Sequence, residues 1–133
     1  MLCSLCERVC WRARKRGLKA RTVTLKLRYT DFQTLSRSRT IAATCSELDL
    51  YPVVREIFAR ARRRSLAIRL LGIALHNLVP DDGQLRLFGC RDESRNRAVD
   101  GVRRRYDYDA IRSGLTYDRP RRERSEDWSR GKP

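Results

Sequence analysis

The sequence has few of the residues on which membrane insertion and secretion depend. No apolar run approaches the ~20 residues that a membrane-spanning helix needs. Glu7, Arg8 and Arg12 interrupt the apolar start of the chain, so no signal peptide is expected. Five cysteines are present, and an odd number without a secretory signal indicates free thiols in a reducing compartment. These features predict a cytoplasmic protein with no membrane partner.

Positive charge is what the sequence has in excess. Its 31 Lys and Arg residues oppose 16 Asp and Glu, for a formal net charge of +15. Most of these cations are arginine, whose forked guanidinium suits phosphate. Hydrophobic residues still make up 41% of the 133 residues, which is enough for one small folded domain. Composition therefore predicts a domain that binds a polyanion and disfavours a small-molecule substrate.

The chain changes character after Phe88, where its apolar content falls. Residues 1–90 hold 18 Lys and Arg against 7 Asp and Glu, whereas residues 91–133 hold 13 against 9. We therefore expect a folded domain over 1–90 and a charged tail over 91–133. Helical spacing predicts a short helix near 96–112, which could dock on the domain or on a partner. Residues 115–133 are expected to be disordered.

Five elements are predicted in the folded part from periodicity and turn signals. Helices are expected over Leu2–Arg16 and from Ser46 or Asp49 to about Arg63. Strands are expected over Arg21–Tyr29, Phe32–Ile41 and Ser65–Leu78. The order α-β-β-α-β predicts an α+β fold, in which an antiparallel sheet is backed by two helices on one face.

The other face of this sheet is predicted to carry cations and hydroxyls. Thr24, Lys26 and Arg28 alternate with the apolar residues of the first strand. Arg37 and Arg39 follow on the next strand, although they share its face with apolar neighbours, which predicts a bulge or a fraying end. Such a row is too polar for a core. A solvated surface is one interpretation; with the net charge of the domain, phosphate binding is the favoured one.

Two blocks of sequence carry a resemblance to a known family. Lys19–Thr40 reads KARTVTLKLRYTDFQTLSRSRT, and Ile68–Leu78 reads IRLLGIALHNL. In that order and spacing they resemble the C-terminal little finger domain of Y-family translesion DNA polymerases, in particular the bacterial DNA polymerase IV group. The resemblance covers about residues 2–90. It implies an open sheet face that holds the backbone of double-stranded DNA without reading its sequence.

The resemblance also assigns residues to that role. The expected DNA contacts are cations and hydroxyls on the strands: Thr24, Lys26, Arg28, Ser36, Arg37, Ser38, Arg39 and Arg69. Of the other polar side chains, His76 is expected to be exposed or to face DNA.

A second family signature follows the last predicted strand. Gln84–Phe88 resembles the Q-L-x-L-F peptide with which bacterial polymerases bind the sliding clamp, so Gln84, Leu85, Leu87 and Phe88 are expected clamp contacts. In an extended peptide, two apolar side chains would fill a pocket while the glutamine orients the segment. The alternative is a last strand that packs its leucines on the core.

The sequence also departs from the family. Nucleotidyl transfer needs clustered carboxylates that hold metal ions, and the carboxylates of residues 1–90 are scattered. No catalytic residue and no cofactor are therefore expected, although a complete polymerase of the family would use Mg²⁺. The family's domain begins with a strand before its first helix, and this sequence has none. We therefore expect an N-terminally truncated fragment that does not polymerise DNA by itself.

Cys3, Cys6 and Cys10 form a C-x2-C-x3-C pattern. A metal site is one interpretation, but no second cysteine pair exists, and positions i, i+3 and i+7 also form one helix face. Burial as small apolar residues is favoured, and no metal is expected.

The sequence favours sequence-independent DNA binding in translesion synthesis and DNA repair, with a peptide that tethers the chain to the sliding clamp. The protein is then expected to be associated with the nucleoid. The alternative is a stand-alone clamp-interacting protein without significant DNA binding. An RNA-binding α+β domain is a weaker hypothesis, because no aromatic stacking platform is evident.

Overall fold

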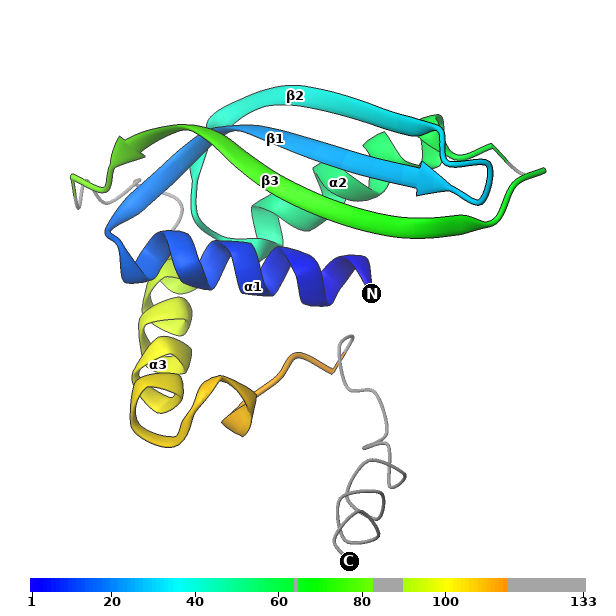
Figure 1. The fold of residues 1–133 in the computed structure, drawn as a ribbon. Coiled ribbons are helices and arrows are strands. Elements are labelled where there is room, and N and C mark those ends of the chain that lie inside the picture. Colours follow the sequence, from blue (N-terminus) through cyan, green and yellow to red (C-terminus); the bar gives the residue numbers. More distant parts are fainter. Residues whose placement is uncertain (64, 83–89, 115–133) are drawn as a thin grey trace, which may run out of the picture.

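Three antiparallel strands form a sheet with helices on one side only (Figure 1). The computed structural model describes residues 1–63, 65–82 and 90–114. The elements are α1 (Leu2–Lys15), β1 (Leu18–Tyr29), β2 (Thr34–Thr44), α2 (Glu47–Ala61), β3 (Ile68–Pro80), α3 (Cys90–Tyr106) and a 3-10 turn, η1 (Tyr108–Ala110). The sheet order is β2-β1-β3. This confirms the predicted α+β fold, and no helix within the described ranges is long and apolar enough to cross a membrane.

The central strand β1 supplies the middle of the core. Val23, Leu25, Leu27 and Tyr29 are each at most 2% exposed, and they alternate with residues of greater exposure. They pack against a cluster that includes Cys6 and Cys10 of α1 and Leu50 and Val54 of α2. Alternation along a strand buries one face and leaves the other free, as the sequence predicted for this strand.

The turn between β1 and β2 starts the second strand later than predicted. Phe32 adopts φ 64°, in the left-handed region that an L residue seldom occupies outside turns. Its backbone N–H donates to the carbonyl of Tyr29 at 3.0 Å, and Asp31 accepts from the N–H of Gln33. Phe32 therefore belongs to the turn, and β2 begins at Thr34.

The structure decides between the two predicted starts of α2 in favour of Ser46. Ser46 is the N-cap residue, whereas Asp49 lies inside the helix and accepts a hydrogen bond from the Thr44 hydroxyl at 2.7 Å. Pro52 consequently sits beyond the first turn of the helix, where it removes one backbone donor.

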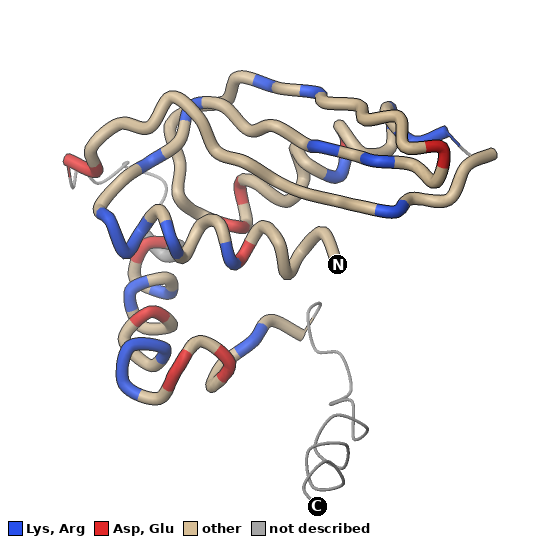
Figure 2. Tube along the Cα trace, in the orientation of Figure 1, with Lys and Arg blue, Asp and Glu red and all other residues tan. Residues whose placement is uncertain are grey.

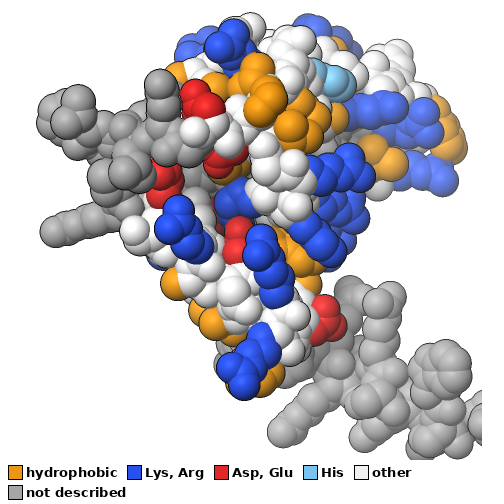
Figure 3. Space-filling model, turned by 90° about the vertical axis from the view of Figure 1, so that its left-hand side faces the viewer, with side chains coloured by type: hydrophobic (Ala, Val, Ile, Leu, Met, Phe, Trp, Pro, Cys, Tyr) orange, Lys and Arg blue, Asp and Glu red, His pale blue; other side chains and the backbone are white. Residues whose placement is uncertain are grey.

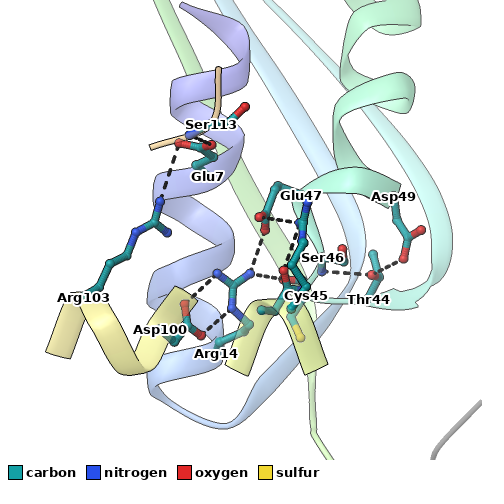
Figure 4. A network of polar contacts seen from close by, with 12 residues as sticks. Glu7, Arg14, Thr44, Cys45, Ser46, Glu47, Asp49, Asp100, Arg103 and Ser113 are labelled. Atoms are coloured by element: carbon teal, nitrogen blue, oxygen red, sulfur yellow. Dashed lines mark hydrogen bonds and ion pairs between the residues drawn. The ribbon is translucent and has the colours of Figure 1, made fainter. Parts of the chain in front are cut away.

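α3 docks on the domain through charged side chains (Figure 4). Arg14 of α1 donates to both carboxylate oxygens of Asp100, at 2.7 and 2.9 Å, and also to Glu47 and the carbonyl of Cys45. The Arg14 side chain is only 9% exposed. Burial disfavours its charge, but the hydrogen bonds and charges of Asp100 and Glu47 prevail and raise the pKa of Arg14.

A second buried pair lies further along α3. Arg103 is 3% exposed, and its guanidinium is 3.7 Å from the carboxylate of Glu7 on α1. It also donates to the carbonyl of Ile111 and lies over the ring of Tyr108. The helix begins at Cys90, earlier than predicted, and it docks on the domain, which was one of the two alternatives left open. Residues 115–133 lie outside the described residues.

Candidate nucleic-acid interface

Hydroxyl groups line the open face of β1 and β2. The register places Thr24 opposite Ser38, Lys26 opposite Ser36 and Arg28 opposite Thr34. The hydroxyls of Thr24 and Ser38 are 2.8 Å apart, and the guanidinium Nε of Arg28 donates to the Thr34 hydroxyl at 3.0 Å. Directly opposed residues share a face of the sheet, so these predicted contacts form one connected surface on the side away from α1 and α2.

The three strands contain no carboxylate. They carry seven cationic residues: Lys19, Arg21, Lys26, Arg28, Arg37, Arg39 and Arg69. Figure 2 shows Lys and Arg on every strand, with Asp and Glu in the turns and helices. Figure 3 shows that Lys and Arg side chains also cover much of the surface at the α3 end of the molecule. The sheet is therefore a region where nothing on the strands opposes an approaching anion.

Lys26 and Arg28 are the cations that the open face presents most directly. Both are exposed, and among the described residues neither forms an ion pair. On β3, the partner of Lys26 is Gly72, where an added Cβ would meet nothing within 4 Å. The position of β3 directly opposite Lys26 therefore carries no side chain that could cover it.

The structure corrects the placement of Arg37 and Arg39. They lie opposite Leu25 and Val23, whose side chains point toward the helices. The pairing is regular from Thr34 to Thr40, and the register shift comes only beyond that point, so no bulge returns these arginines to the open face. Their side chains extend from the β2 edge of the sheet toward α2, where Arg39 pairs with Glu56.

Arg69 lies at the far end of the sheet, where the pairing of β1 with β3 is irregular. Its guanidinium carbon is 4.5 Å from the centre of the Phe32 ring, which is itself 64% exposed. This cation–π contact holds Arg69 beside the β1–β2 turn. Arg69 thus adds a cation at the tip of the hairpin.

Thr22, Asn77 and His76 extend the polar surface beyond the predicted DNA contacts, and His76 is exposed as expected. Thr22 accepts a hydrogen bond from the Asn77 side chain at 2.8 Å, and exposed His76 stands opposite it on β3. Strand alternation places Thr22 on the same face as Lys26, although Thr22 was not among the predicted DNA contacts. Tyr29 is the sole aromatic residue of the three strands and is 2% exposed, so they offer no aromatic platform for stacking bases.

The cysteines of α1 are placed mainly as core residues. Cys6 and Cys10 are buried, and burial raises the pKa of the Cys6 thiol to about 12. Cys3 is only partly buried. Within the described ranges, no three His, Cys, Asp or Glu side chains come together in a way that could hold a metal ion.

The predicted clamp-binding peptide cannot be placed in this surface. Gln84, Leu85, Leu87 and Phe88 lie outside the described residues. Their role, like the predicted DNA contacts, stays a prediction.

Comparison with known proteins shows the family. The model of the impB/mucB/samB family C-terminal domain matches residues 1–87. The chain belongs to this family, which confirms the resemblance drawn from the two sequence blocks.

Similar proteins are DNA polymerase IV enzymes from several bacteria. The enzyme of Caulobacter vibrioides is 37% identical over 117 residues, which cover 83% of this chain and 28% of that protein. That of Dehalococcoides mccartyi strain 195 is 29% identical over 119 residues, covering 85% of this chain and 30% of that protein. The chain thus spans less than a third of the relatives that it matches.

Proposed function

We propose that this chain holds double-stranded DNA by its sugar-phosphate backbone as the little finger part of a Y-family translesion DNA polymerase. The observation that carries the proposal is a sheet with an open face, seven cations and no carboxylate on its strands. Phosphate contacts position a protein on DNA without reading bases. Such a grip suits an enzyme that has to accept damaged and undamaged template.

The open face and the β2 edge contribute in different ways. Lys26 and Arg28 offer unpaired charge, and the hydroxyls of Ser36 and Ser38 are exposed beside them. Arg37 and Arg39 extend the positive surface around the edge of β2. Hydroxyls and cations together are the groups that contact phosphate oxygens in protein–DNA complexes.

The polymerase chemistry itself is assigned to other parts of a longer protein. The relatives are more than three times as long as the part matched here. Within the described residues, no group of three His, Cys, Asp or Glu residues is placed to hold a metal ion. By this proposal, any Mg²⁺-dependent nucleotidyl transfer takes place outside this chain, and the chain contributes DNA binding, with Gln84–Phe88 as its tether to the sliding clamp.

Fluorescence anisotropy with two duplexes of unrelated sequence tests the proposal. We expect both duplexes to bind the full chain with the same affinity at low salt. The variant Lys26→Gln with Arg28→Gln, Arg37→Gln and Arg39→Gln should weaken binding to both duplexes alike. A loss of affinity for only one of the two duplexes would contradict recognition of the DNA backbone.

A second variant separates DNA binding from clamp binding. Leu87→Ala with Phe88→Ala should abolish binding to the sliding clamp and leave DNA affinity unchanged. If the chain binds the clamp but no duplex at low salt, the alternative of a stand-alone clamp-interacting protein is correct.

A further inference from the structure

A hollow between β2 and α2 gathers three arginines around one carboxylate. Its volume is about 360 Å³, and it is lined by Arg37, Ser38 and Arg39 of β2 and by Glu56, Ile57, Arg60 and Ala61 of α2. Glu56 uses one carboxylate oxygen for Arg39 and the other for Arg60, at 2.7 Å from the Arg60 guanidinium. Among the residues that the structure describes, the Arg37 guanidinium donates to the neighbouring Ser36 carbonyl alone, at 3.3 Å.

The charge in this hollow is unbalanced. Three guanidinium groups face a single carboxylate, so two positive charges are not neutralised by the residues that line it. All three paired side chains are exposed, from 42% for Glu56 to 78% for Arg60. Exposed ion pairs of this kind are weak and are screened by salt, so an anion from solution can displace Glu56 at little cost.

A carboxylate between two arginines resembles a bound phosphate. Guanidinium forks recognise both groups with the same in-plane hydrogen bonds. The hydrogen bond and charge of Arg39 lower the pKa of Glu56, so Glu56 remains an anion at neutral pH. It therefore occupies, with its own negative charge, the position that a phosphate would take.

We propose that this hollow is a second phosphate-binding site, in which Arg39 and Arg60 exchange Glu56 for a DNA phosphodiester. The inference deepens the proposed function and rests on it for the identity of the ligand. Arg60 becomes a DNA contact on a helix, away from the open face. Glu56 acts as an internal competitor that lowers the affinity for DNA backbone.

The site gives a role in DNA binding to Arg37 and Arg39, which the strand register turns away from the open face. A DNA backbone that lies across β2 meets Ser36 and Ser38 on the open face and then passes the edge where these arginines emerge. The two sets of contacts flank the same strand. Together they hold the backbone from two sides of β2.

Two matched pairs of variants test the proposal in duplex binding at low salt. Glu56→Gln and Arg60→Gln alter the hollow. Asp109→Asn and Arg112→Gln alter a comparable exposed ion pair at η1, far from the sheet. Each control makes the same change in net charge as its counterpart.

The expected result is opposite effects within the first pair. Glu56→Gln should tighten binding roughly two- to fivefold, because the loss of a competing surface ion pair is worth ~0.3–1 kcal/mol. Arg60→Gln should weaken binding and lower the salt slope by about 1. Both control variants should stay near wild type. If Glu56→Gln behaves like Asp109→Asn, the effect is only net charge and the proposal is wrong.

An arm with inorganic pyrophosphate separates this proposal from the proposed function. Nuclear magnetic resonance should show shifts of the backbone amides of residues 37–39 and 56–60, stronger in Glu56→Gln than in wild type. If the chain binds no duplex but these shifts appear, the phosphate site stands and DNA as its ligand is wrong. If duplex binds and pyrophosphate moves none of these amides in either protein, the site is refuted while the proposed function stands.

Discussion

Basic residues occur in two contrasting settings: exposed on the sheet, and buried between α1 and α3. On the strands, Lys26 and Arg28 are exposed, and no carboxylate of the described residues forms an ion pair with them. Between the helices, Arg14 is 9% exposed and contacts Asp100 and Glu47. The comparison shows that the net charge of +15 does not identify the binding surface. Local pairing decides which cations are available to a ligand and which only hold the fold together.

The largest expected effect concerns the buried pairs. Arg14→Met takes from Asp100 the arginine that holds both its oxygens and leaves Glu47, among the described residues, with Arg95 alone. Breaking a buried pair typically costs ~3–5 kcal/mol. Urea unfolding followed by circular dichroism should show this loss. Arg12→Met, two residues away on the same helix and exposed, is the control and should stay within ~0.5 kcal/mol of wild type.

The same pair of variants tests whether buried arginines contribute to DNA binding. Under conditions where Arg14→Met is folded, its affinity for DNA should fall no more than that of Arg12→Met. If Arg14→Met weakens DNA binding as strongly as Arg28→Gln does, buried and exposed arginines are not distinct in function.

The exposed cations of the sheet should behave in the opposite way, because their loss should affect DNA binding but not stability. Lys26→Gln with Arg28→Gln should leave the free energy of unfolding within about 0.5 kcal/mol of wild type, since both side chains are exposed. Thermal unfolding measures this directly. A large loss of stability would mean that these cations support the fold, contrary to their assigned role.

An intermediate loss of stability is expected from a variant on the buried face of β1, in contrast to one on its open face. The Tyr29 hydroxyl donates to the carbonyl of Ala61 at 2.9 Å and accepts from the N–H of Arg63 at 3.2 Å, so it holds the end of α2. Tyr29→Phe should cost ~1–2 kcal/mol, because a buried carbonyl and an N–H lose their partner. Thr24→Val removes the exposed hydrogen bond to Ser38 and should cost less. Equal losses in chemical denaturation would contradict the distinction between the faces.

The smallest perturbation is chemical labelling of the cysteines. Burial raises the pKa of Cys6 to about 12 and also raises that of Cys10, so at pH 8 both remain neutral thiols in the folded chain. Iodoacetamide followed by peptide mass spectrometry should label Cys3 first, and Cys6 and Cys10 only after unfolding. Rapid labelling of Cys6 in the folded protein would show that α1 does not pack as described.

Much of the sheet was predictable because its pattern is local. The alternation of Val23, Leu25, Leu27 and Tyr29 indicated the buried face of β1, and the structure confirms it. Strand alternation also placed Arg37 and Arg39 on the same face of their strand as apolar residues. A bulge or a fraying end was expected in this strand, and the register does shift between Thr40 and Thr44. The shift lies beyond Arg37 and Arg39, so it does not bring them to the open face.

The docking of α3 could not be predicted for a different reason. Its partners are far away in sequence, 86 positions between Arg14 and Asp100, and the contacts are polar. Charged residues on a helix normally indicate a solvated face, so no periodicity reveals that Asp100 and Arg103 are buried. The pairing of Arg39 with Glu56 likewise depends on how α2 lies against β2, whereas the Arg60–Glu56 pair is a local contact between positions i and i+4 of one helix.

The salt dependence of duplex binding shows whether Lys26 and Arg28 contact the DNA backbone. The logarithm of the binding constant should fall linearly with the logarithm of salt concentration, because each neutralised phosphate releases counterions. In Lys26→Gln with Arg28→Gln, the slope should be smaller by about 2, one for each lost phosphate contact. An unchanged slope in this variant, or no binding by the wild-type chain at low salt, would contradict the account.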